Sequence, residues 1–284
     1  MSSTSIRLVL LDIDGTIVDS ARSRSVTPEL AQTIRNVAAR GISIGLATGR
    51  NYGHMMSQMR SIGFTGPFIC NGGAYIVKDG ACLFESLLPR EVLDAAWERV
   101  LLEQGYIEFS GRDVMYTFIA PGYTGPIFPK VGTDDYLRIL RSVDEYSAVR
   151  DAPISKITIV VDSQEKAKSL SHYWTQGPFA SAVTLTRSFW FALEITNRAV
   201  TKGSGLSLVA ENLGLKLEEV MAVGDGDNDA EILRTAGVSF AMGNASPAAM
   251  AAAKYRAPSV QEDGARIILQ RYVLDGVPLP ALPR

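Results

Sequence analysis

Carboxylates stand in two short clusters, and each cluster follows an apolar run. Asp12 and Asp14 come directly after residues 6–11 (IRLVLL), whose composition predicts a buried strand. Residues 224–229 (GDGDND) follow a second such run, VMAV. In an open α/β sheet, ligands bind beyond the carboxyl ends of the strands, so both clusters are expected at one edge. Grouped carboxylates repel one another, and Mg²⁺, which prefers oxygen ligands, would relieve that repulsion. The two clusters therefore predict a magnesium site.

Groups suited to binding an anion follow two further elements. Thr48, Gly49 and Arg50 come after the strand-like residues 42–47 (ISIGLA) and offer a hydroxyl and backbone N–H groups. Lys202 opens a predicted helix in the segment TKGSG, so its ammonium and the positive end of the helix can face one anion. A bound cation, an anion-binding loop and a nucleophilic carboxylate are together what phosphoryl transfer requires.

A calcium loop is the main alternative for the second acidic cluster. Asp225, Asp227 and Asp229 match the first three ligand positions of such a loop. The match fails further on, because Ala230 stands where a glycine is required and Ala236 where a bidentate glutamate is required. We therefore keep the interpretation of a magnesium site.

The sequence gives no support for a serine hydrolase or for the common nucleotide-binding loops. Residues 41–45 (GISIG) match the serine-hydrolase elbow, but Ser43 lies inside an apolar run, whereas the elbow needs a sharp turn from strand to helix. The sequence holds no GxxxxGK[ST] and no GxGxxG, so nothing predicts nucleotide binding through those loops.

The elements that must position these residues alternate between strand and helix at both ends of the chain. Thr27 and Pro28 are typical of a helix start, and short connections join the strand-like runs, which favours a parallel sheet wound by helices. Between them, residues 89–104 predict a helix, and the runs YIEFS, VMYTFIA, KITIVV and residues 183–195 predict antiparallel strands. We expect a core of residues 1–82 and 197–284, with an α+β domain inserted at residues 83–196.

Composition excludes several classes of protein. The chain of 284 residues carries 28 Lys+Arg and 30 Asp+Glu, with 46% hydrophobic residues, as in a soluble globular protein without a basic nucleic-acid-binding surface. It holds no apolar run of about 18 residues, and its first residues lack the features of a secretory signal, so we expect neither a membrane span nor secretion. Cys70 and Cys82 form no metal motif and are interpreted as free thiols. We expect a cytoplasmic monomer or homodimer that binds neither membrane nor nucleic acid.

The four motifs together resemble a known family. DIDGT, LATGR, TKGSGL and GDGDND, in this order and spacing, are similar to the motifs of the haloacid dehalogenase-like (HAD) superfamily of phosphatases. The long insert, the Asn71-Gly72 turn and the tail AMGNASP resemble its Cof-type or class IIB subgroup. The resemblance implies an α/β fold with a doubly wound, mostly parallel sheet, the HAD-like Rossmannoid core, and an inserted α+β cap.

The resemblance also implies roles for the motif residues. Asp12 would be the nucleophile that becomes an aspartyl-phosphate, and Asp14 the general acid and base. Mg²⁺ would be held by Asp12, the backbone carbonyl of Asp14 and Asp225, with Asp229 as a further ligand or a neighbour of the ligands. The remaining site residues would bind phosphate (Thr48, Gly49, Lys202 and Asn228) or substrate (Arg50, Asn71 and Gly72).

The expected function is therefore a Mg²⁺-dependent phosphatase that acts on a small phosphorylated metabolite, commonly a sugar phosphate in this family. A phosphomutase of hexose phosphates would use the same intermediate, and a catalytically silent sensor would keep only the binding site. Within the insert, Lys156, Arg112 and Arg187 are candidate anion contacts, although they are equally compatible with solvated charges.

Overall fold

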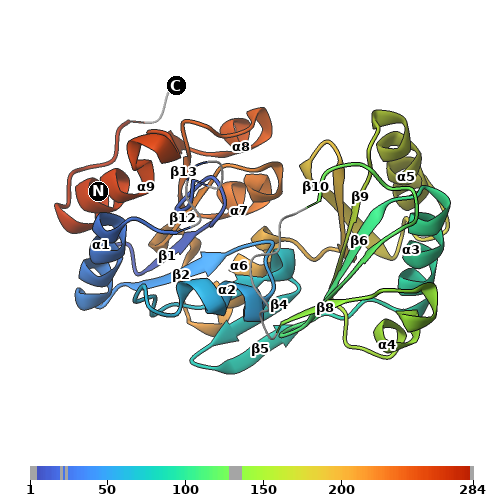
Figure 1. Cartoon of the computed structure of the whole chain (residues 1–284). Helices are drawn as coiled ribbons and strands as arrows, with labels where there is room; N and C mark the ends of the chain where they lie inside the picture. Colours follow the sequence, from blue (N-terminus) through green and yellow to red (C-terminus); the bar gives the residue numbers. More distant parts are fainter. Residues whose placement is uncertain (1–4, 20–21, 23–24, 128–135, 282–284) are drawn as a thin grey trace.

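A computed structural model describes residues 5–19, 22, 25–127 and 136–281, which form two sheets (Figure 1). The first sheet has eight strands in the order β14-β13-β12-β1-β2-β3-β4-β5, and β14 to β3 are parallel. The strands β4 and β5 continue the sheet antiparallel. Their bounds are β1 Leu8–Leu11, β2 Ser43–Ala47, β3 Phe68–Cys70, β4 Tyr75–Lys78, β5 Ala81–Glu85, β12 Val220–Gly224, β13 Val238–Ala241 and β14 Tyr255–Arg256. The predicted α/β class with a mostly parallel sheet is confirmed.

Capping residues fix where the helices of this sheet begin. The side chain of Thr27 accepts a hydrogen bond from the backbone N–H of Leu30, as predicted, and Asn51 and Thr201 act in the same way on their helices. The helices are α1 Pro28–Ala39, α2 Tyr52–Met59, α6 Lys202–Asn212, α7 Ala230–Thr235, α8 Pro247–Ala252 and α9 Gly264–Ile268. Because Thr201 caps α6, Lys202 is its first residue.

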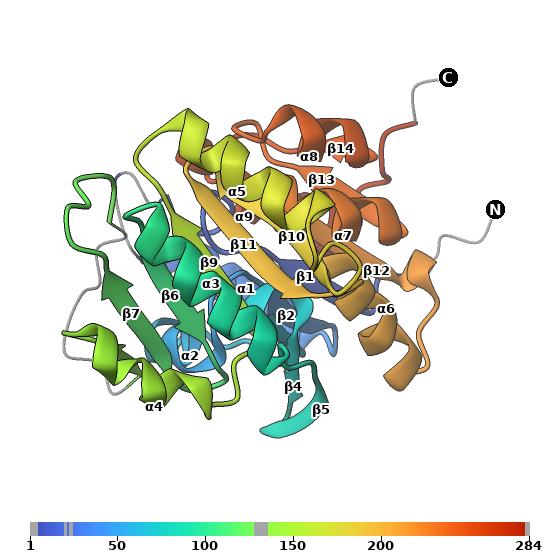
Figure 2. The ribbon, with the colours of Figure 1, turned by 90° about the vertical axis from the view of Figure 1, so that its right-hand side faces the viewer.

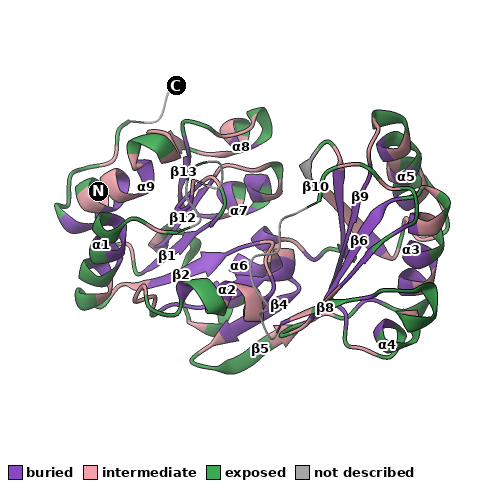
Figure 3. Ribbon diagram, viewed as in Figure 1, coloured by how far each residue is buried: buried purple, intermediate pink, exposed green. Residues whose placement is uncertain are grey.

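Helices cover both faces of the first sheet, because its strands are buried on both sides. In β1, Leu8 and Leu10 pack with Leu206 of α6, whereas Val9 and Leu11 pack on the opposite face with α1 and α9. The central strands β1 and β12 are buried along their whole length (Figure 3). Each fully buried Leu or Val side chain contributes about 1.5–3 kcal/mol, so this double layer holds the strand ends in a rigid position.

The second sheet has six strands in the order β10-β11-β9-β6-β7-β8, antiparallel except for the pair β7 and β8. One face is covered by α3 and α5, and the other is turned toward the first sheet (Figures 1 and 2). We call residues 86–197, which carry this sheet, the cap. Its elements are α3 Arg90–Leu102, β6 Tyr106–Ser110, β7 Met115–Ile119, β8 Leu137–Ile139, α4 Ser147–Arg150, β9 Lys156–Val160, α5 Gln164–Gln176, β10 Val183–Phe189 and β11 Ala192–Asn197.

Two details differ from the sequence interpretation. The expected boundary between residues 82 and 83 falls within β5, which pairs with β4 up to Glu85. The expected division into domains itself stays a prediction. The strand-like run at residues 183–195 is a hairpin of β10 and β11, with the turn between Phe189 and Ala192.

In the described part of the chain, no helix combines the length and the apolar character that a bilayer crossing requires.

Candidate active site

The carboxyl ends of β1, β2 and β12 bring the predicted motif residues to one edge of the first sheet. The backbone N–H of Asp12 donates to the carbonyl of Val223 at 2.9 Å, which ties the end of β1 to β12. From the start of α6, the Nζ atom of Lys202 donates to Oδ1 of Asp12 and to Oδ1 of Asp229, both at 2.6 Å. Three segments far apart in sequence therefore meet in one buried cluster of charges.

The loop after β12 is held by Asp229. Its Oδ2 atom accepts hydrogen bonds from the backbone N–H groups of Asp225 and Gly226, each at 2.9 Å. Since Oδ1 is bonded to Lys202, both carboxylate oxygens of Asp229 already have partners in the protein. The geometry therefore suits Asp229 to fixing the ammonium of Lys202 and the shape of this loop.

The carboxylate of Asp225 lies against the turn that follows β1. The hydroxyl of Thr16 donates to its Oδ1 at 3.1 Å, and the amide of Asn244 donates to its Oδ2 at 3.2 Å. A Cβ atom on Gly15 would lie 2.1 Å from Asp225 Oδ2, and Gly15 also has a φ of +81°. Only glycine fits at this position, because any side chain would collide with the carboxylate of Asp225.

The acidic cluster fits a divalent cation. Among the described residues, Asp12, Asp225 and Asp229 each offer an oxygen, and these oxygens lie within 4.8 Å of one another. Burial, followed by the charge of Asp229, raises the pKa of Asp12 well above its usual value, although Lys202 opposes the shift. Burial and Asp229 also raise the pKa of Asp225 to about 7. The ionised carboxylates are thus costly on their own, and a bound cation would offset that cost.

Lys202 is 1% exposed, yet its pKa is raised. Burial alone would lower it, but the charges and hydrogen bonds of Asp12 and Asp229 outweigh burial. The lysine therefore stays an ammonium, which suits a group that faces a phosphoryl anion.

Asp14 lies at the exposed margin of the site and is paired with Arg50. The guanidinium donates to Oδ2 of Asp14 from Nε at 2.9 Å and to Oδ1 from an Nη atom at 2.6 Å. Arg50 also donates to the side-chain oxygen of Gln58. Both carboxylate oxygens of Asp14 therefore accept hydrogen bonds from Arg50 in this arrangement.

The predicted anion-binding loop lies beside this cluster, at the end of β2. Thr48 is 1% exposed, and its hydroxyl oxygen accepts a hydrogen bond from the backbone N–H of Arg50 at 3.1 Å. Its own N–H donates to the carbonyl of Ile69, and its carbonyl accepts from Gly72. Asn71 is wholly buried, and its amide donates to the cap residues Gly111 and Ser155. The structure thus places Asn71 at the junction between the sheets.

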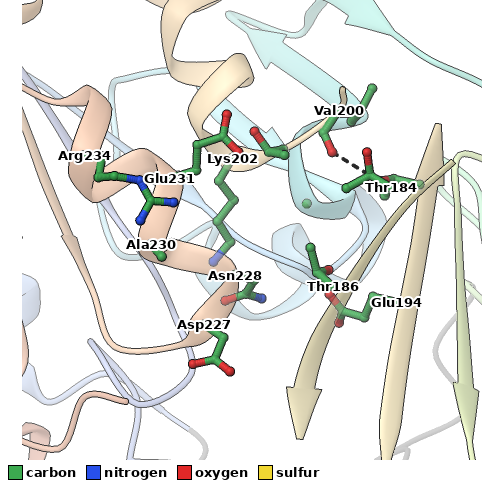
Figure 4. A pocket seen from close by; sticks show the side chains of 13 residues that line it. Thr184, Thr186, Glu194, Val200, Lys202, Asp227, Asn228, Ala230, Glu231 and Arg234 are labelled. Atoms are coloured by element: carbon green, nitrogen blue, oxygen red, sulfur yellow. Dashed lines mark hydrogen bonds between the residues drawn. The ribbon is translucent and has the colours of Figure 1, made fainter. Parts of the chain in front are cut away.

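A cavity of about 210 Å³ adjoins the site between the cap and the first sheet. Figure 4 shows Lys202 and Asn228 on one side of it and Thr186 and Glu194 on the other. Gly72 also lines it, whereas Asp12 and Asp14 lie outside its walls. The cavity therefore reaches the charged cluster through Lys202 and Asn228.

Some residues at the site were not found by sequence reasoning. Thr16 and Asn244 contact Asp225, and their only signals were the DIDGT turn and the resemblance of the tail AMGNASP. Nothing in the sequence points to Glu194 of the cap, because it is one of several polar residues that alternate with apolar ones along β11. Of the candidate anion contacts in the insert, Arg112 pairs with Asp113, and Arg187 donates to Ser171 on α5.

Known proteins share this sequence pattern and fold. The family model of the haloacid dehalogenase-like hydrolases matches residues 9–269. A phosphoglycolate phosphatase of Methanopyrus kandleri is 29% identical over 84% of each chain. The 5-amino-6-(5-phospho-D-ribitylamino)uracil phosphatase YbjI of Escherichia coli is 26% identical over 96% of this chain and 98% of its own. The fold is also that of the HAD subclass IIB sugar phosphatase BT4131, with a TM-score of 0.76, 22% identity and coverage of 94% of this chain and 98% of that one. The predicted family is confirmed: this chain belongs to the haloacid dehalogenase-like hydrolases, in their Cof-type subgroup.

Proposed function

We propose that the protein is a Mg²⁺-dependent phosphatase that hydrolyses small phosphorylated metabolites through an aspartyl-phosphate on Asp12. The observation that carries this proposal is the contact of Asp12 with Lys202, next to Asp225 and the Thr48 loop, at one sheet edge. A nucleophile, a fixed cation and a metal-binding cluster are thus together, as phosphoryl transfer requires. The two curated relatives named above are phosphatases of small phosphorylated compounds, which supports the same reaction class here.

In the first half-reaction, the carboxylate of Asp12 attacks phosphorus, and the bond from phosphorus to the leaving oxygen breaks. Asp14 gives its proton to that oxygen, so the alcohol leaves neutral. In the second half-reaction, Asp14 takes a proton from water and the water oxygen attacks the phosphorus of the aspartyl-phosphate. The bond from phosphorus to the Asp12 oxygen breaks, so the carboxylate of Asp12 is restored and inorganic phosphate leaves. Lys202 balances the phosphoryl charge throughout, and Thr48 donates its hydroxyl hydrogen to a phosphoryl oxygen.

The metal site fits Mg²⁺, which favours hard oxygen ligands. Asp12, Asp225 and the backbone carbonyl of Asp14 would hold the ion, and Asp229 would fix their surroundings through Lys202 and the loop after β12. When bound, Mg²⁺ would supply the positive charge that lets an anionic ester approach a carboxylate nucleophile.

We propose further that the leaving group is small and rich in hydroxyl groups, as in a sugar or polyol phosphate. The hydroxyl-bearing side chains Thr184, Thr186, Thr196 and Thr201 line the cavity, together with the carboxylate of Glu194. Threonine hydroxyls can donate to and accept from the hydroxyls of a substrate, and a carboxylate accepts from them. The described lining includes no aromatic side chain on which a flat ring could stack.

The test is a turnover screen of about a hundred phosphorylated metabolites with purified protein and Mg²⁺, followed as release of inorganic phosphate. We expect hydrolysis of sugar or polyol phosphates, and loss of at least about 10⁴-fold in the variant Asp12→Asn, which removes the nucleophile. Phosphate release by that variant at the wild-type rate would exclude the mechanism.

Two other results would redirect the proposal. Conversion of a hexose 1-phosphate to its 6-phosphate without phosphate release would identify a phosphomutase. Failure to release phosphate from any ester, including p-nitrophenyl phosphate, under every divalent metal would favour a sensor.

A further inference from the structure

The cap sheet turns a polar face toward the first sheet. Ile157 and Ile159 of β9 point into the cap's own apolar cluster, so Lys156 and Thr158 point the other way, since side chains alternate along a strand. The register places Glu194 of β11 beside Thr158. Lys156 and Glu194 are thus diagonal neighbours on one face, near the end of β2.

Lys156 contacts both the cap and the first sheet. Its Nζ atom donates to the carbonyl of Gly49 at 2.6 Å and to Oε1 of Glu194 at 3.3 Å. Both charged side chains are nearly buried, with 7% and 9% of their surfaces exposed. A Cβ atom on Gly49 would lie 3.5 Å from each of these groups, so the ion pair sits directly on the anion-binding loop.

The bond to Gly49 reaches Thr48 through one peptide unit. The carbonyl of Gly49 and the N–H of Arg50 belong to the same planar peptide. Lys156 holds the carbonyl end, and the N–H end donates to the hydroxyl oxygen of Thr48 at 3.1 Å. An ammonium on the carbonyl also polarises the peptide and strengthens its N–H as a donor. With that acceptor position filled, the hydroxyl hydrogen of Thr48 is directed to another partner.

We propose that Lys156, held by Glu194, is a positioning residue: through the Gly49–Arg50 peptide it orients the Thr48 hydroxyl toward the transferring phosphoryl group. The inference rests on the proposed phosphatase function for its consequence, although the contact itself does not. Because the ammonium comes from the cap and the loop from the first sheet, the hydroxyl is oriented only while the two are in contact.

A purely structural role makes a different prediction. If Lys156 only neutralised the buried carboxylate of Glu194, removing both charges together would restore activity along with stability, because that carboxylate would no longer be left without its cation. If Lys156 orients the loop, the double variant regains stability but not turnover.

The experiment compares Lys156→Met, the double variant Lys156→Met/Glu194→Gln, and Lys254→Met as a matched control. Like Lys156, Lys254 donates to the backbone of a loop, here to the carbonyls of Ala236 and Gly237, but it lies away from the cap. With p-nitrophenyl phosphate, we expect kcat to fall about 10²-fold in both Lys156 variants while KM changes less than about threefold. The double variant should recover the melting temperature of the wild type, and Lys254→Met should keep its kcat.

Hydrogen exchange separates this inference from the function on which it rests. The amide hydrogen of Arg50 should exchange about tenfold faster in both Lys156 variants than in the wild type, since its peptide loses one anchor. Recovery of kcat in the double variant, or unchanged exchange at Arg50, would overturn the positioning role. If the wild type hydrolyses no ester, the phosphatase proposal fails, and the exchange rate at Arg50 still decides whether Lys156 orders the loop.

Discussion

Among the described residues, the first sheet and the cap each place a buried lysine near the site, and Lys202 and Lys156 differ in what holds them. Lys202, at the edge of the first sheet, donates to two carboxylates of that same sheet's loops. Lys156, on the cap, donates to one cap carboxylate and to one carbonyl across the junction. The surroundings of Lys202 are therefore complete without the cap, whereas those of Lys156 depend on contact between the two sheets.

This difference separates a permanent part of the site from a conditional one. The network of Lys202, Asp12 and Asp229 is fixed by strand ends and by a capped helix, so it exists before substrate arrives. The contact between Lys156 and Gly49 forms only when the cap lies against the first sheet. Closing a cap over a site excludes water and completes the arrangement of groups. We therefore expect substitutions at the edge of the first sheet to lower activity and stability more than substitutions in the cap.

The variant Lys202→Met should give the largest effect. It leaves the carboxylates of Asp12 and Asp229 buried without their cation, so we expect a loss of about 3–5 kcal/mol in the free energy of unfolding. Turnover should fall by about 10³-fold or more, because a preorganised positive charge is lost. Urea unfolding and phosphate release measure the two effects, with Lys254→Met as control. A stability equal to that of the wild type would mean that the Lys202 network is not essential to the fold.

The variant Asp225→Asn tests the metal site. We expect about 10²–10³-fold lower activity at a fixed Mg²⁺ concentration, because one ligand charge is lost. Mg²⁺ at millimolar concentration should raise the melting temperature of the wild type by about 2–4 °C and leave that of the variant unchanged. The metal-free variant should be at least as stable as the metal-free wild type, since burial and Asp229 already disfavour the charge on Asp225. Equal Mg²⁺ shifts in both proteins would place the ion elsewhere.

The edge of the first sheet could be predicted from the sequence because its chemistry is local. Asp12, Thr48 and the loop after β12 each directly follow an apolar run, and the topology rule for strand ends places them together. The hydrogen bonds of Asp229 could not be predicted, because spacing does not show that both of its oxygens are taken by Lys202 and by backbone N–H groups.

The cap could be predicted only as a class of structure. Its polar residues alternate with apolar ones along the strands, which predicts a half-buried sheet but not which residues meet. Glu108, Thr158 and Glu194 lie in one row only because of the pairing of β6, β9 and β11. Register depends on turns and on contacts across the whole sheet. The resemblance covers this region by position and length alone, so it assigns no residue of the cap.

The variant Thr186→Val should give the smallest effect, at the cap side of the cavity. It keeps the shape of the side chain and removes one hydroxyl from the lining. One lost hydrogen bond is worth about 0.5–1.5 kcal/mol, so KM for a sugar phosphate should rise by about 3–10-fold with little change in kcat. The KM for p-nitrophenyl phosphate should stay the same, because its aryl leaving group offers no hydroxyl to Thr186.

Thr235→Val is the matched control, since the hydroxyl of Thr235 donates to the carbonyl of Glu231 within the same helix, α7. An equal rise in KM for both substrates would mean that Thr186 acts on the phosphoryl group or on cap contact. No rise for any sugar phosphate would remove Thr186 from the leaving-group pocket. A rise confined to hydroxylated substrates would assign leaving-group selection to the cap, while the charged edge of the first sheet binds the phosphoryl group that all substrates share.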